Sequence, residues 1–132
     1  MLRLHIENND LEFFQKSKIL NIMEPSDRTE QFLIVMALGY NLGSKTKLVG
    51  KKALILEDSI KKDQLALMNI VAIDECDDIK MISNKKEVFN IAEQYANTGI
   101  KYLQKIENES QYDEEIAKFE SIVNKAYNKI EF

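Results

Sequence analysis

The stretch Phe32–Thr46, FLIVMALGYNLGSKT, decides the fold, because it suits either a buried strand before a phosphate-binding loop or a helix that ends at a glycine. The phosphate-loop pattern G-x-x-x-x-G-K-[ST] needs a second glycine five residues after the first. Gly39, Lys45 and Thr46 fit this pattern, but Ser44 occupies the place of the second glycine. The sequence ALILED, soon afterwards, would suit a second strand of a nucleotide-binding fold.

The helical interpretation agrees better with the flanking residues. Ser26 or Asp27 can cap a helix that runs to about Leu42, and Gly43 is typical of a helix C-terminus. The segment after Gly43 is not helical, so no helix N-terminus is present to hold a phosphate. Strand is the rival assignment for FLIVMAL, since seven residues fit either structure. A helix that is apolar on nearly all sides is usually central and buried.

Capping residues and apolar spacing predict four more helices, at about residues 10–24, 59–75, 84–107 and 111–130. The first stops at Pro25, and the second is expected to be buried. Candidate N-caps are Asn9 or Asp10, Asp58 or Ser59, and Ser83 or Asn84. In the helix at 10–24 the expected apolar face is Leu11, Phe14, Ile19, Ile22 and Met23, and in the helix at 59–75 it is Leu65, Met68, Ala72 and Cys76. In the helix at 84–107 it is Val88, Ile91, Ala92, Tyr95, Gly99, Tyr102, Leu103 and Ile106. In the last helix it is Ile116, Phe119, Val123, Ala126, Tyr127 and Ile130.

The remaining segments leave little room for a sheet. Residues 1–8 alternate loosely and suit a short extended arm, and residues 44–57 suit a turn at Gly50 with an extended piece or a small hairpin. Only four glycines and one proline interrupt the 132 residues. The sequence therefore predicts one all-α domain over residues 1–132, a compact bundle of about five helices, with a short β-hairpin or extended segment around 44–57.

Composition excludes several classes of protein. The chain is 45% hydrophobic and 30% charged, as in a soluble globular domain, with a net charge of −4. One cysteine, Cys76, and one histidine, His5, cannot build a disulfide framework or a zinc site of the usual kind. No signal-like or membrane-length apolar run is seen, so a cytoplasmic location without membrane contact is expected.

The charges are unevenly distributed along the chain. Residues 31–56 contain no Asp or Glu but four lysines, whereas acids gather at 74–78. Such segregation gives a dipolar surface if the two groups lie on different faces. The lysines suit contacts to nucleic-acid phosphates or to an acidic protein, with a nearby tyrosine able to stack, and a solvated loop is the plain alternative. The candidate binding residues are Tyr40, Lys45, Lys47, Lys51 and Lys52.

No catalytic, metal or cofactor site emerges from the other reactive side chains. The acids at 74–78 lack the spacing of a calcium loop and suit a polar helix end. Cys76 has no histidine beside it in sequence and is interpreted as a packing or surface thiol. Tyr95 and Tyr102 share a helix face and suit the core, while Gly99 suits the close approach of a neighbouring helix. The chain looks like a binding or assembly component.

Two stretches carry a resemblance to a known family. They are FLIVMALGYNLG, residues 32–43, and ALMNIVAIDECDDIKMISNKKEVFNIAEQYANTGI, residues 66–100. Over about residues 29–106 the chain resembles the small Dnd system-associated proteins encoded beside bacterial DNA phosphorothioation genes. Those have a helix ending in an ALGY-type motif, a glycine and an arginine pair, and later an EYANGG-like motif. This chain departs from those motifs at Ser44, Lys45, Gln94 and Thr98.

The resemblance implies an anti-phage defence locus and transfers no catalytic residue. It predicts a non-catalytic accessory or adaptor subunit that docks on larger defence proteins, nuclease or ATPase subunits, with nucleic acid reached through the complex. The alternative is a small DNA- or RNA-binding module that uses the basic loop 44–52, and a third is a nucleotide or small-molecule sensor with a pocket between helices. A homo-oligomer stays open.

Overall fold

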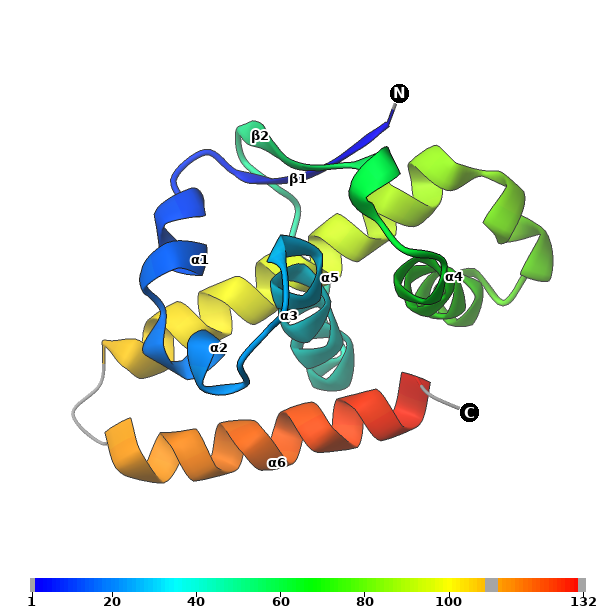
Figure 1. Ribbon diagram of the computed structural model, residues 1–132. Helices are drawn as coiled ribbons and strands as arrows, with labels where there is room; N and C mark the ends of the chain where they lie inside the picture. Colours follow the sequence, from blue (N-terminus) through cyan, green and yellow to red (C-terminus); the bar gives the residue numbers. More distant parts are fainter. Residues whose placement is uncertain (1, 109–111, 131–132) are drawn as a thin grey trace.

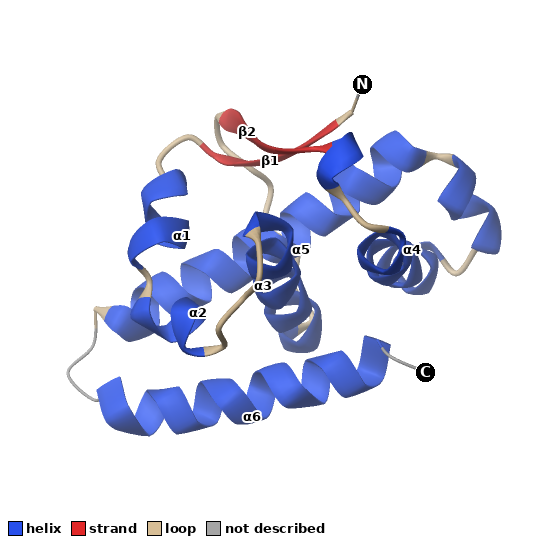
Figure 2. Ribbon diagram, viewed as in Figure 1, coloured by secondary structure: helices blue, strands red, loops and turns tan. Residues whose placement is uncertain are grey.

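Six α-helices and a two-stranded sheet make up the part of the chain that the computed structural model describes, residues 2–108 and 112–130 (Figures 1 and 2). The prediction of an all-α fold is confirmed, although six helices form rather than five. None of the described helices is long and apolar enough to cross a bilayer. The elements in chain order are β1 (Arg3–Glu7), α1 (Leu11–Lys16), α2 (Lys18–Ile22), α3 (Arg28–Leu42), β2 (Lys51–Leu56), the 3₁₀ turn η1 (Glu57–Ser59), α4 (Lys62–Cys76), the 3₁₀ turn η2 (Ile79–Ser83), α5 (Lys85–Glu107) and α6 (Tyr112–Ile130).

Helix α3 is the centre of the domain, as its apolar composition predicts. Asp27 caps it, with a side-chain oxygen that accepts the backbone N–H of Glu30 at 2.7 Å. Gly43 ends it in the left-handed conformation at φ +72°. All residues from Gln31 to Gly39 are buried. The strand alternative for FLIVMAL is therefore wrong, and the stretch that resembles a phosphate loop is a helix C-terminus, where free carbonyls repel anions.

Two glycines let α3 and α5 cross in direct backbone contact (Figure 1). A Cβ atom on Gly39 would lie 1.9 Å from the carbonyl oxygen of Tyr95, and one on Gly99 would lie 2.0 Å from that of Val35. Neither position accepts a side chain without moving a backbone. The expected role of Gly99 as the site of a close helix approach is confirmed, and Gly39 plays the same role from the other helix.

Helix α6 covers α3 on the side away from the sheet (Figure 1). Val123 and Ala126 are fully buried there, in line with the predicted apolar face. The other expected positions of that face, Ile116, Phe119 and Ile130, have side chains outside the described part of the structure.

The first predicted helix is in fact two helices, because Ser17 breaks it. Ser17 has extended backbone, with ψ of 118°, and its hydroxyl accepts the N–H of Leu20 to cap α2. The same hydroxyl donates to the Glu107 carboxylate at 2.6 Å, which fixes the break against the end of α5. Because of this break, Ile22 is 42% exposed instead of lying on the apolar face.

The N-terminal arm pairs with the extended segment after the basic loop. Strands β1 and β2 are antiparallel, so β2 does not form the local hairpin considered for residues 44–57. The pairing is irregular between Leu4 and His5. Leu4, Ile6 and Ile55 are buried, and β1 lies against α5.

Helix α4 begins later and is less buried than predicted. Asp58 and Ser59 belong to the η1 turn, and Lys61 is the N-cap residue. Only four of its 15 residues are buried, since α4 lies at the edge of the domain and packs one side against α3 and α5. Cys76, expected on its apolar line, is exposed at the C-terminal end.

Candidate binding surface

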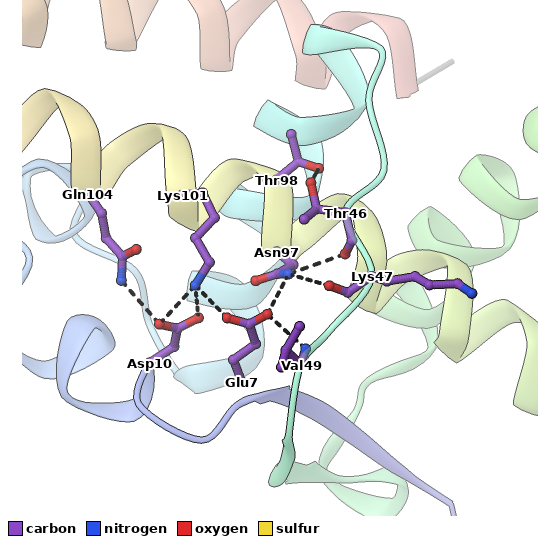
Figure 3. A network of polar contacts seen from close by, with 9 residues as sticks. All are labelled: Glu7, Asp10, Thr46, Lys47, Val49, Asn97, Thr98, Lys101 and Gln104. Atoms are coloured by element: carbon purple, nitrogen blue, oxygen red, sulfur yellow. Dashed lines mark hydrogen bonds and ion pairs between the residues drawn. The ribbon is translucent and has the colours of Figure 1, made fainter.

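Residues 44–50 of the basic loop 44–52 are held along α5 by a series of polar contacts (Figure 3). The backbone N–H of Thr46 donates to the carbonyl oxygen of Gln94 at 3.1 Å, and the hydroxyls of Thr46 and Thr98 lie 2.8 Å apart. The buried side chain of Asn97 donates to the carbonyl oxygens of Thr46 and Lys47 at 3.2 and 3.3 Å. These contacts fix the loop backbone, so the lysine side chains project from a rigid support.

A second layer of the same network ties the loop to the N-terminal arm. Glu7 accepts from the Asn97 amide at 3.2 Å and from the backbone N–H of Val49 at 2.9 Å. The ammonium of Lys101 lies 2.7 Å from the Glu7 carboxylate and 3.0 Å from that of Asp10 (Figure 3). The carboxylate of Asp10 therefore binds α5, and it makes no capping hydrogen bond to α1.

The charges of this network stabilise one another. Burial opposes ionisation of Glu7, but hydrogen bonds from Lys101, Val49 and Asn97 outweigh it and lower the pKa of Glu7. Burial likewise opposes the charged form of Lys101, yet its bonds to Glu7 and Asp10 raise the pKa of Lys101. Both groups are therefore charged at neutral pH.

The four candidate lysines fall into two pairs with different roles. Lys45 forms an ion pair with Glu75, and the ammonium of Lys51 lies 3.7 Å from the buried carboxylate of Glu93. Lys47 and Lys52 are exposed and have no ion pair among the described residues. In Figure 3 the side chain of Lys47 extends away from the network. Only half of the predicted basic surface is thus free to meet a partner.

The side chain of Tyr40 contacts α4, so its ring is not free to stack on a nucleic-acid base. Its hydroxyl donates to Asp74 at 2.5 Å, and its ring meets that of Tyr95 edge to face at 5.6 Å. Tyr95 in turn donates to Glu75 at 2.6 Å. Burial, helped by the Asp74 carboxylate, raises the pKa of Tyr40 to about 12. Because Lys45 also binds Glu75, the basic and acidic groups share a surface, and the expected separation onto different faces does not hold there.

The acids at 74–78 otherwise form the polar helix end that the sequence suggests. Asp77 ends α4 with φ of 51°, and Asp78 caps η2. Among the described residues, no three His, Cys, Asp or Glu side chains gather closely enough to hold a metal ion.

Sequence reasoning missed two anchoring residues on α5. Glu93 is 4% exposed and accepts from the backbone N–H and Nδ1 of His5 at 2.6 and 2.8 Å. Asn97 is equally deep, and its Oδ1 has no partner among the described residues. The only signal was polarity on a buried stretch of helix, and the pairing of β1 with β2, which brings their partners, has no local mark in the sequence.

A separate surface exposes large apolar side chains at the edge of the domain. Ile79 and Ile82 are 70% and 46% exposed, and their spacing of three residues puts them on one side of the 3₁₀ turn η2. We call Ile79 and Ile82 the η2 patch.

The two motif stretches meet inside the molecule. The ALGY stretch brings Gly39 and Tyr40 against Tyr95 and Gly99 of the EQYANTG stretch, at the crossing of α3 and α5. The family model for DNA sulphur modification system-associated protein 4 matches residues 26–129, which covers both stretches. No curated protein and no solved structure matches the chain.

Proposed function

We propose that this chain, which belongs to the family of DNA sulphur modification system-associated protein 4, is a non-catalytic accessory subunit of a bacterial anti-phage defence complex. It docks on a larger protein of the system, a nuclease or ATPase subunit. The description of the family as system-associated supports a role beside other proteins.

The η2 patch is the observation that carries this proposal. Ile79 and Ile82 leave apolar area in water that a partner could cover, and complete burial of an aliphatic side chain contributes about 1.5–3 kcal/mol. Exposed apolar side chains that gather in one place are typical of a surface that binds another protein. Helix α4, whose C-terminal end leads into η2, packs against this turn.

The residues of the family motifs have structural roles inside the domain, which leaves the outer surface to bind a partner. Gly39 and Gly99 serve the helix crossing, Tyr40 and Tyr95 hold α4, and Asn97 anchors the basic loop. These residues build a scaffold that presents η2 and the loop on rigid supports.

The test is co-expression of the tagged chain with the neighbouring gene products of its locus, followed by affinity purification and sizing. Ile82→Glu in the η2 patch is compared with Ile22→Glu on α2, since the two isoleucines are 46% and 42% exposed. Burying a carboxylate in an apolar interface is costly, so Ile82→Glu is expected to reduce recovery of the complex at least tenfold. Ile22→Glu should leave recovery unchanged.

Two results would count against this function. One is that the chain elutes alone, whichever gene product of its locus is co-expressed with it. The other is turnover of nucleotide or nucleic acid by the purified chain that a single substitution abolishes, since the proposed subunit is non-catalytic.

Nucleic-acid binding by the basic loop is the second candidate, and the exposed, unpaired state of Lys47 and Lys52 favours it. Each phosphate contact releases a counterion, so binding by this loop would weaken steeply with salt. A salt titration with Lys47→Glu and Lys52→Glu in one chain tests it. Equal DNA binding by the wild type and this variant at every salt concentration would eliminate this function.

A further inference from the structure

A pocket of about 630 Å³ lies between the N-terminal arm and the first half of α5. This volume falls within the roughly 300–1,000 Å³ of pockets that bind small molecules. Two strands and one helix build its wall, so its shape is set by regular structure. The lining residues are Leu2, Arg3, His5, Lys51, Asn84, Lys86, Glu87, Phe89, Asn90 and Glu93.

The wall of this pocket carries cations that the protein itself does not neutralise. Arg3 on β1 and Lys86 on the first turn of α5 face the pocket from different elements, and neither has an ion pair among the described residues. The first turn is also the positive end of the dipole of a 23-residue helix. An anion in the pocket would meet positive charge from two sides.

Of the two acids of the wall, Glu93 is paired with cationic or N–H donors, whereas Glu87, in the first turn of α5, contacts only a neutral amide in the described part of the chain and offsets part of the positive charge there. Glu93 accepts two hydrogen bonds from His5 and lies 3.7 Å from the Lys51 ammonium. Glu87 accepts from the amide of Asn90 at 3.5 Å. Leaving His5 aside, the three cations Arg3, Lys51 and Lys86 exceed the two carboxylates Glu87 and Glu93 by one charge.

We propose that this pocket binds a small organic phosphate the size of a mononucleotide, whose phosphate is bound by Arg3 and Lys86. The guanidinium of Arg3 supplies the paired donors that suit phosphate oxygens, and Lys86 adds a point charge. The apolar side chain of Leu2 and the amide of Asn90 line the remaining space for the organic part. The inference is independent of the docking role, because the η2 patch shares no residue with the pocket.

The test is calorimetric titration of the full chain with AMP, GMP, CMP and UMP, with inorganic phosphate and a single-stranded oligonucleotide as further probes. Arg3→Gln and Lys86→Gln remove one cation each. Lys105→Gln is the matched control, since Lys105 is an exposed lysine on the same helix outside the pocket. We expect saturable binding of at least one mononucleotide, weakened tenfold or more by Arg3→Gln and by Lys86→Gln and less than twofold by Lys105→Gln.

Several results would overturn the inference. These are no saturation by any mononucleotide, equal binding by wild type and both pocket variants, inorganic phosphate bound as tightly as the best mononucleotide, or binding of the oligonucleotide alone. Complex recovery, measured in parallel, separates this test from that of the docking role: Arg3→Gln should keep the complex, and Ile82→Glu should keep the titration.

Discussion

Helices α3 and α4 have the same length and nearly the same apolar character, yet they differ in how much of each is buried. Each has 15 residues, of which ten are buried in α3 and four in α4. Helix α3 is enclosed by α5, α4 and α6, and Gly39 lets it approach α5 at backbone distance. Helix α4 has no glycine and packs on one side only. An all-round apolar helix can therefore be a core element or a half-open edge.

The two helices also differ in what holds them in place. Apolar packing holds α3, whereas the C-terminal end of α4 is held by polar contacts from Tyr40, Tyr95 and Lys45 to Asp74 and Glu75. Polar contacts respond to pH and salt, but apolar burial hardly does. The edge helix should thus loosen under conditions that leave the central helix unchanged.

The largest expected difference is in the cost of removing a leucine. Leu38→Ala in α3 should lower the free energy of unfolding by about 4 kcal/mol, because Leu38 is fully buried and its loss leaves a cavity. Leu67→Ala in α4 should cost only about 1 kcal/mol, since Leu67 is half-buried and the site can collapse. Urea unfolding of both variants measures this, and equal costs would remove the distinction between the two helices.

A smaller loss is expected from filling the helix crossing. Gly39→Ala puts a Cβ atom 1.9 Å from the carbonyl oxygen of Tyr95, so α3 and α5 must separate, at about 3 kcal/mol. Gly43→Asn is the control, because asparagine tolerates the left-handed conformation and nothing lies within 4 Å of a Cβ there. Thermal melts compare the two. A Gly39→Ala variant as stable as Gly43→Asn would show that the crossing is not tight.

The smallest effect is on alkaline stability. The pKa of Tyr40 is about 12 in the folded chain, against about 10 unfolded, because burial and Asp74 favour its neutral form. Burial and Glu75 also raise the pKa of Tyr95. A raised pKa means that the stabilisation is complete below pH 10 and is lost as pH rises from 10 through 12.

The pH dependence can be isolated with a single variant. Tyr40→Phe keeps the ring but cannot ionise, so its stability should fall less steeply than that of the wild type between pH 10 and 12. Unfolding by urea at several pH values in this window gives the slopes. Parallel slopes would mean that Tyr40 does not link the fold to pH.

Local signals in the sequence were enough for the central helices. Asp27 and Gly43 mark both ends of α3, Asn84 marks the start of α5, and Gly99 marks the crossing, because capping and close approach need particular residues at particular places. Membership of a Dnd-associated family could likewise be predicted, from motifs that turn out to build this crossing.

The remaining features depend on partners distant in sequence. Ser17 breaks the first helix because Glu107 is there to accept from it. The carboxylate of Asp10 does not cap α1, because it accepts hydrogen bonds from Lys101 and Gln104 instead. The pairing of β1 with β2 joins residues that are more than 40 positions apart. For the candidate site, the lysines could be identified from the sequence, but the pairing of Lys45 with Glu75 and of Lys51 with Glu93 could not.

Hydrogen exchange of the chain alone and in a complex recovered by co-purification with the products of its locus tests the proposed docking most directly. Alone, the amides of α3 should exchange slowly, and those of α4 and η2 faster. In the complex, exchange in η2 and the adjoining residues of α4 should slow at least tenfold, with α3 unchanged. Protection confined to the basic loop, or no change in η2, would contradict the account.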